Sequence, residues 1–176
     1  MFATIYLPNF YLQAATRHQP ELGGKAVALI ETRERKLIMT QLNPNAETAG
    51  VRIGMTPSQG LARSLSLIIK TRALEQEKLL EELLLQHAFT LSPNVEATAP
   101  GICTVEFSDH RNLLNKVSRV VEQLARCQVS AQAAVAPSPD TSLLGAHLAR
   151  PVLEIDNAKD FLAPLPIEVL ACSAVR

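Results

Sequence analysis

Residues 92–109 read SPNVEATAPGICTVEFSD, and this stretch decides how the rest of the sequence is interpreted. It predicts two strands, at about 94–98 and 101–107, joined by a turn that contains Gly101. Glu96 and Glu106 flank the turn, but the turn itself carries no carboxylate. We therefore expect a β-hairpin whose tip has little side-chain chemistry of its own.

The segments around this hairpin alternate between strands and helices. Short apolar runs predict further strands at 2–7, 25–31, 36–41, 65–71 and 129–135. Helical spacing of apolar residues predicts helices at 10–18, 73–90, 112–127 and 141–149. The segment 25–31 is almost continuously apolar, which is typical of a strand buried on both faces. Strands interleaved with helices favour an α/β (α+β) domain in which helices cover a central sheet.

The segment 73–90 is the clearest helix in the sequence. Its apolar stripe consists of five leucines, namely Leu74, Leu79, Leu80, Leu83 and Leu84. The other face is expected to hold the charged residues Glu75, Glu77, Lys78, Glu81 and Glu82. We predict that the leucine stripe packs on the sheet and that the charged residues lie on the opposite face.

Composition excludes several classes of protein. The 176 residues include 17 basic and 17 acidic side chains, so no basic excess points to nucleic-acid binding by bulk charge. Cys103, Cys127 and Cys172 are widely spaced and form no CxxC pair, which favours reduced thiols. No apolar run approaches the ~20 residues that span a bilayer. We expect a soluble, cytoplasmic protein with one substantial core and room for a small second lobe.

Three blocks of sequence carry a family resemblance. They are IYLPNFYLQAA at 5–15, GVRIGMTPSQGLARSLSLI at 50–68 and SPNVEATAPGICTVEFSD at 92–109. In this order they resemble the first strand and helix, the fingers segment and the palm hairpin of the Y-family translesion DNA polymerases. The fingers segment of that family begins with a Gly-Val-x-x-Gly-Met turn, and its palm hairpin reads Glu-x-x-Ser-Ile-Asp-Glu-x-x-x-Asp. The resemblance covers nearly the whole chain.

The resemblance implies a polymerase-type palm with a mostly antiparallel central sheet covered by helices. The palm would comprise residues 1–21 and 73–160, and a small fingers-like subdomain would occupy residues 22–72. Residues 161–176 would begin a thumb or a linker.

The functional residues of the family are missing at the matching positions. Where the family has its metal-binding Asp, a following Asp and the Asp-Glu pair, this sequence has Tyr6, Pro8, Gly101 and Ile102. Where the family has the Tyr and Arg that hold the incoming triphosphate, it has Pro44 and Glu47. Two Mg²⁺ ions must share carboxylate ligands, and a tyrosine phenol with a pKa near ~10 is a poor substitute. We therefore predict no catalytic or nucleotide-binding residue, no metal and no cofactor.

One branch of the family shows the same losses. The ImuB-like proteins of bacterial mutasomes favour Ser-Pro-x-Val-Glu and Ala-Pro-Gly-x-Cys-Thr in this region, and residues 92–104 fit both patterns. The resemblance implies a non-catalytic scaffold in the DNA damage response and error-prone translesion synthesis. Its implied partners are an ImuA-like protein, an error-prone replicative-type DNA polymerase and the sliding clamp, reached through regions beyond this chain.

Two other functions stay open. A divergent but active Y-family polymerase would need a relocated metal site, for which Glu96, Glu106 and Asp109 are the available carboxylates. A palm-like interaction module outside DNA repair would be favoured if Tyr6 did not lie near Gly101 and Ile102 in the fold.

Contact of this chain with DNA is a separate question. Four basic residues in and after the fingers-like segment are candidates for contact with template phosphates, namely Arg52, Arg63, Lys70 and Arg72. Because the net charge is zero, a solvated face is the favoured interpretation and DNA contact is the alternative.

Overall fold

The computed structural model describes residues 1–109 and 111–167, and it divides into two compact units. The larger unit comprises Met1–Pro8 and Glu81–Arg176, and the smaller unit comprises Asn9–Leu80. The domain boundaries expected from the sequence, 1–21 with 73–160 and 22–72, stay a prediction. The expected thumb or linker at 161–176 is described only as far as Ile167, and Cys172 lies outside the described residues.

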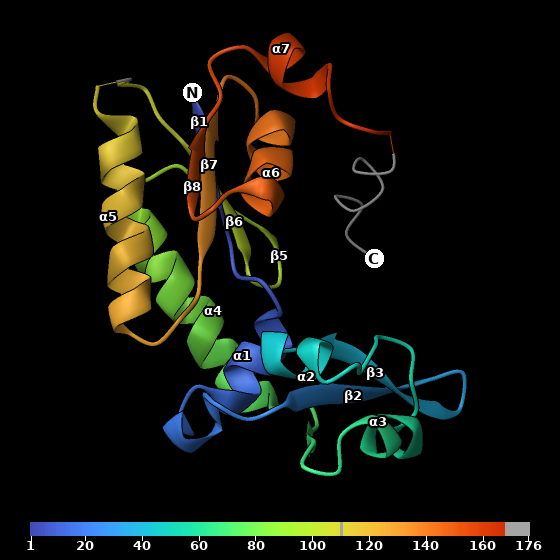
Figure 1. Cartoon of the computed structure of the whole chain (residues 1–176). Coiled ribbons are helices and arrows are strands. Elements are labelled where there is room, and N and C mark those ends of the chain that lie inside the picture. The colour runs from blue at the N-terminus through green and yellow to red at the C-terminus, as the bar shows by residue number, and fades with distance from the viewer. Residues whose placement is uncertain (110, 168–176) are drawn as a thin grey trace. The chain divides into compact units, whose positions relative to one another are not determined.

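The larger unit is built on a five-stranded sheet with the strand order β5-β6-β1-β7-β8 (Figure 1). Its strands are β1 (Phe2–Tyr6), β5 (Val95–Ala99), β6 (Ile102–Glu106), β7 (Gln132–Ala136) and β8 (Val152–Glu154). β5, β6, β1 and β7 pair antiparallel in that order, and β8 joins β7 in parallel. The predicted hairpin and the mostly antiparallel central sheet are confirmed.

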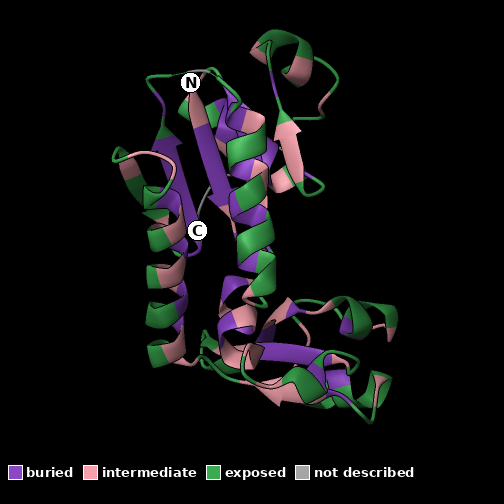
Figure 2. Ribbon diagram, turned by 90° about the vertical axis from the view of Figure 1, so that its left-hand side faces the viewer, coloured by how far each residue is buried: buried purple, intermediate pink, exposed green. Residues whose placement is uncertain are grey.

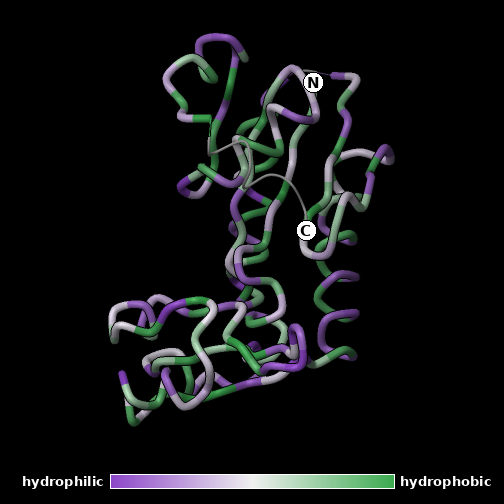
Figure 3. Tube along the Cα trace, turned by 90° about the vertical axis from the view of Figure 1, so that its right-hand side faces the viewer, coloured by the Kyte–Doolittle hydropathy of each residue, from purple (hydrophilic) through white to green (hydrophobic). Residues whose placement is uncertain are grey.

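Helices cover both faces of this sheet. The larger unit contains the second half of α4 (Leu74–Phe89) together with α5 (Leu113–Arg126), α6 (Pro139–Leu148) and α7 (Ala158–Leu162). α5 and α6 lie on opposite faces of the sheet (Figure 1). Figure 2 shows the central strands and the inward sides of the helices as buried. Along the helices, hydrophobic residues are interspersed with hydrophilic ones (Figure 3). None of the described helices combines the length and hydropathy needed to span a membrane.

α6 packs unusually close to the sheet because of a glycine. A Cβ atom on Gly145 would lie 2.8 Å from the Cβ of Ala134 on β7 and 2.6 Å from Cδ1 of Ile155. These distances are shorter than normal van der Waals contacts, so a larger residue would push the helix away. The close approach lets the buried Ser142 of α6 reach the buried Thr4 of β1, with 2.7 Å between their hydroxyl oxygens.

The predicted leucine stripe of α4 is wrong in part. Leu80 and Leu84 are fully buried, as is Ala88, but Leu74 is 63% exposed and Leu79 is 51% exposed. Glu77, expected on the charged face, is instead only 6% exposed. Positions 77, 80, 84 and 88 repeat at three- and four-residue intervals, so they form the true buried face of the helix.

The smaller unit is a three-stranded sheet with short helices around it. Its elements are α1 (Phe10–Thr16), η1 (Pro20–Leu22), β2 (Val27–Arg33), β3 (Lys36–Leu42), α2 (Pro44–Thr48), α3 (Pro57–Arg63) and β4 (Ile68–Lys70). The order is β3-β2-β4, with β3 antiparallel and β4 parallel to β2. Burial of this strand on both faces is confirmed for its first three residues only, because Ala28 belongs to one hydrophobic cluster while Val27 and Leu29 belong to another. The rest of β2 is half-buried or exposed.

Glu77 is buried because an arginine of the smaller unit neutralises it. Arg72 donates from Nε to Oε1 of Glu77 at 2.7 Å and from Nη2 to Oε2. The guanidinium also lies 3.7 Å from the ring centroid of Tyr11, and its Nη1 is 3.4 Å from Glu31 Oε1. The hydrogen bonds to Glu77 raise the pKa of Arg72 above its ordinary value, so the guanidinium stays charged. A bidentate ion pair with a stacked aromatic ring ties β4, α1 and the start of α4 together.

We expect Glu77→Ala to destabilise the protein by about 1–3 kcal/mol, because it leaves a partly buried guanidinium without its main partner. Glu75→Ala is the matched control on the same helix, since Glu75 is exposed and should change stability by less than about 0.5 kcal/mol. Urea denaturation of both variants measures the difference, and equal effects would contradict a structural role for the Arg72–Glu77 pair.

Candidate functional site

The positions that the resemblance assigns to metal ligands lie close together at one end of β1. Tyr6 is the register partner of Ile102 across the β1–β6 pair. The Leu7 N–H donates to the carbonyl oxygen of Gly101 at 2.8 Å, and Pro8 follows directly in the chain. A palm-type sheet with Tyr6 beside Gly101 and Ile102 is therefore present. An interaction module without such a sheet is not favoured, because that alternative required these residues to lie apart.

A glutamate of α4, Glu81, holds the backbone of Gly101 in place. The Gly101 φ of 74° lies in the left-handed region that glycine adopts without strain. Its N–H donates to Oε2 of Glu81 at 2.8 Å. Burial raises the pKa of Glu81, and the hydrogen bond from Gly101 partly offsets this effect. The sequence placed Glu81 on the charged outer face of its helix, and this is wrong because its carboxylate turns in to bind the hairpin.

The opposite side of the corner is occupied by two aromatic rings. The ring of Tyr6 lies 4.1 Å from that of His147 on α6, centroid to centroid, with an angle of 47° between the planes. Burial raises the pKa of Tyr6 and lowers the pKa of His147. Both side chains are therefore neutral at pH 7, and the phenol keeps its proton. Nothing about this pair favours coordination of a hard cation.

The two Mg²⁺ ions that the family implies do not fit the residues of this corner. A phenol, a proline ring, a glycine and an isoleucine provide no carboxylate oxygen at Tyr6, Pro8, Gly101 and Ile102. Cys103, next along β6, is fully buried, and burial together with the charge of Glu81 raises the pKa of its thiol to about 12. Within residues 1–109 and 111–167, no three His, Cys, Asp or Glu side chains are placed to hold a metal ion.

Neither Glu96 nor Glu106, two of the carboxylates available for a relocated site, is a register partner of Tyr6 or Ile102. Glu106 is the register partner of Phe2, and Glu96 is opposite Thr104. Four residues of β6 separate Glu106 from Ile102, which corresponds to roughly 13 Å along an extended strand. Asp109 instead accepts a hydrogen bond from the Arg111 N–H and pairs with that residue's side chain.

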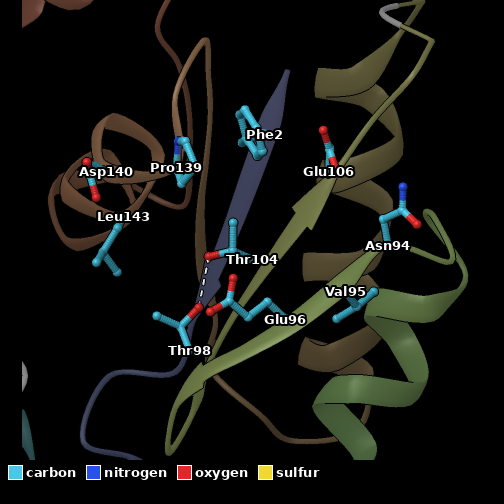
Figure 4. A pocket seen from close by; sticks show the side chains of 10 residues that line it. All are labelled: Phe2, Asn94, Val95, Glu96, Thr98, Thr104, Glu106, Pro139, Asp140 and Leu143. Atoms are coloured by element: carbon cyan, nitrogen blue, oxygen red, sulfur yellow. Dashed lines mark hydrogen bonds between the residues drawn. The ribbon is translucent and has the colours of Figure 1, made fainter.

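Glu96 and Glu106 line a groove of about 440 Å³ on the α6 side of the sheet (Figure 4). Asp140, Pro139 and Leu143 of α6 form one wall. The floor includes Phe2, Thr98 and Thr104. We call this cavity the palm groove.

Hydroxyl groups connect the floor of the palm groove to the core. The Oγ1 atom of Thr104 lies 3.1 Å from the hydroxyls of both Thr98 and Thr4 (Figure 4 draws the first contact). Thr4 in turn contacts Ser142, which donates to the carbonyl of Pro139 at 2.7 Å. The chain of hydroxyls therefore satisfies the buried polar groups and fixes α6 against β5, β6 and β1.

In the smaller unit, the two positions that the resemblance assigns to triphosphate contacts, Pro44 and Glu47, lie on one short helix. Pro44 is the first residue of α2, and the side chain of Asn43 caps this helix by accepting from the Ala46 N–H at 2.9 Å. Glu47 is in its first turn and borders an open cavity of about 680 Å³ with Arg52. Nη1 of Arg52 donates to the carbonyls of Glu47 and Val51 at 2.7 and 2.8 Å. Arg52 thus caps the backbone around the end of α2.

The other three basic candidates differ in their surroundings. Arg63 is exposed in the last turn of α3. Nζ of Lys70 donates to Oε1 of Gln19 at 2.7 Å, and Arg72 is held in the ion pair with Glu77 described above. Contact of these residues and of Arg52 with DNA stays a prediction.

The contact between Glu81 and Gly101 gives a prediction with two variants. Glu81→Ala leaves the Gly101 N–H without its acceptor and should cost about 1–2 kcal/mol of stability. Glu81→Gln keeps an acceptor and removes a partly buried charge, so it should match or exceed the wild type at pH 7.

The pH dependence of stability separates these two variants further. A raised folded-state pKa means that Glu81 contributes stability below its unfolded pKa, which is lost as the pH rises through the folded pKa. The advantage of Glu81→Gln over the wild type should therefore grow from acidic to neutral pH in chemical denaturation. Stability of Glu81→Ala equal to that of the wild type at every pH would show that this hydrogen bond does not stabilise the fold.

Comparison with known proteins identifies a family that this chain matches over most of its length. Residues 5–140 match the impB/mucB/samB family. DNA polymerases IV of Pseudomonas syringae pv. tomato (strain ATCC BAA-871 / DC3000) and Pseudomonas savastanoi pv. phaseolicola (strain 1448A / Race 6) are each 24% identical over 170 residues, covering 92% of this chain and 48% of theirs. The chain thus spans about half the length of these relatives.

Solved structures show the same fold. The post-insertion binary complex of Dbh DNA polymerase has a TM-score of 0.84 at 16% identity, over 96% of this chain and 52% of that chain. DinB from Sulfolobus solfataricus has a TM-score of 0.80 at 16% identity, with the same coverage. Because the family match extends over well more than half of its residues, the chain belongs to the impB/mucB/samB family and has the fold of the Y-family DNA polymerases.

Proposed function

We propose that this chain is part of a non-catalytic Y-family scaffold of the ImuB type, acting in the DNA damage response and error-prone translesion synthesis. It would help to connect an ImuA-like protein and an error-prone replicative-type DNA polymerase to the sliding clamp. The contacts with those partners would be made largely by regions beyond these 176 residues.

One observation carries this proposal. The register of β1 and β6 places Tyr6 and Ile102 directly opposite each other. The family resemblance assigns both positions to metal-binding carboxylates, and this supports the proposal. Transfer of a nucleotide in this family needs two metal ions held by shared carboxylates. A phenol that burial keeps protonated and an alkyl side chain supply neither the charge nor the ligands.

A second, independent loss supports the same conclusion. Glu47 stands where the family has a triphosphate-binding arginine, so a negative charge replaces a positive one. At close range this changes attraction to a phosphate into repulsion. Because Tyr6 and Glu47 belong to different compact units, one local rearrangement would not restore both functions.

An active, divergent polymerase is the competing function, and the relatives named DNA polymerase IV favour it. Primer extension with Mg²⁺ or Mn²⁺ separates the two. We expect no nucleotide incorporation by this chain in its full-length protein, with the polymerase IV of Pseudomonas syringae as the positive control. Incorporation that is abolished by Glu96→Gln or Glu106→Gln would overturn the proposal and identify a relocated metal site.

The geometry of the corner also predicts a gain of metal binding. Side chains opposite each other in an antiparallel pair have Cβ atoms about 4.5–5.5 Å apart, close enough for two carboxylates to share a cation. We expect the double variant Tyr6→Asp/Ile102→Glu to bind Mn²⁺, measured by electron paramagnetic resonance, and the wild type to show no site at this corner. The isosteric variant Tyr6→Asn/Ile102→Gln is the control and should not bind. Equal Mn²⁺ binding by the wild type and the double variant would contradict the loss of the site.

A further inference from the structure

The palm groove has acidic walls, and none of the described residues that line it is basic. Glu96 on β5, Glu106 on β6 and Asp140 on α6 approach it from three different elements (Figure 4). All three are exposed, and none of the ion pairs found within residues 1–109 and 111–167 involves them. Like charges that converge without a cation repel a phosphate backbone and attract a positive group.

The remaining lining of the groove is apolar enough to hold more than a charge. Two half-buried residues contribute to it, Phe2 in the floor and Leu143 in the wall that also holds Pro139 (Figure 4). Lysine and arginine bury their methylene stems against such surfaces while their charged groups stay at the polar rim. A groove with aliphatic and aromatic walls and a rim of carboxylates therefore matches these two side chains.

The edge of the sheet beside the groove favours an extended ligand. β5 pairs only with β6 in the described part of the chain, so its other side is an open edge. Its central residues Glu96, Ala97 and Thr98 are all exposed. An open edge offers backbone hydrogen bonds to a peptide in the strand conformation, and the neighbouring groove then receives alternate side chains of that peptide.

We propose that the palm groove and the open edge of β5 form a docking site for an extended, lysine- or arginine-bearing segment of a protein partner. This inference rests on the proposed scaffold function and identifies a surface through which the scaffold would bind a partner. The face of the sheet that holds the nucleotide-transfer positions would then bind a basic protein segment in place of nucleic acid.

A pair of model peptides tests this site. The first is fluorescein-labelled Arg-Val-Lys-Thr-Arg-Val, and the second has glutamate at each basic position. We expect fluorescence anisotropy to detect binding of the basic peptide only, with affinity that falls as salt is added. Hydrogen exchange of the β5 amides should slow when the basic peptide is bound.

Two triple variants locate the binding. Glu96→Gln/Glu106→Gln/Asp140→Asn neutralises the groove and should weaken binding of the basic peptide by about tenfold, because it removes three exposed charge pairs with the peptide. Glu82→Gln/Glu122→Gln/Glu154→Gln makes the same change in net charge at exposed positions outside the groove, and it should bind like the wild type. All six residues are exposed, so both variants should fold, which circular dichroism checks.

Three results would overturn the docking site. They are equal weakening by the two triple variants, no binding of the basic peptide by the wild type, and competition by a single-stranded oligonucleotide that the groove variant no longer binds. Primer extension keeps this test separate from the proposed function. A chain without polymerase activity that also fails to bind the peptide would reject this docking site alone, whereas nucleotide incorporation would reject the scaffold.

Discussion

The antiparallel pairing of β1 with β6 is the constraint on which the larger unit depends. It joins residues about a hundred positions apart, as the contact between Thr4 and Thr104 shows. The same register places Tyr6 opposite Ile102 at one end and Phe2 opposite Glu106 at the other. A slip of one residue would turn every side chain to the other face of the sheet, so the metal-site corner and the palm groove are fixed by a single register.

The close packing of α6 on the sheet determines which side chains lie beside Tyr6 and which line the palm groove. Gly145 lets the helix lie against Ala134, and the hydroxyls of Ser142, Thr4 and Thr104 then connect without buried unsatisfied groups. As a result His147 covers Tyr6, and Asp140 at the other end of the helix becomes a wall of the groove. One tightly packed helix therefore covers the corner at Tyr6 and borders an acidic groove beside it.

Local sequence patterns predicted most elements correctly, and their failures have a common cause. The hairpin, the central strands and the long helices follow from the short-range spacing of apolar residues. This spacing depends on the geometry of the strand or helix itself and not on its neighbours in the fold. The buried face of α4 did not follow from its leucines, because burial of Glu77 depends on Arg72 and Tyr11. Glu81 was likewise assigned to the charged face because the acceptor needed by the Gly101 N–H could not be anticipated from α4 alone.

The sequence by itself determined which side chains stand at the positions that the resemblance assigns to metal ligands. Tyr6, Pro8, Gly101 and Ile102 lack metal-binding carboxylates in any conformation, because ligand chemistry belongs to the residue and not to its surroundings. Only the tertiary structure decided that three of these residues meet in one corner, that a histidine ring covers the tyrosine, and that distant carboxylates line one groove. Those facts depend on strand register and helix packing between segments far apart in the chain, which no local pattern encodes.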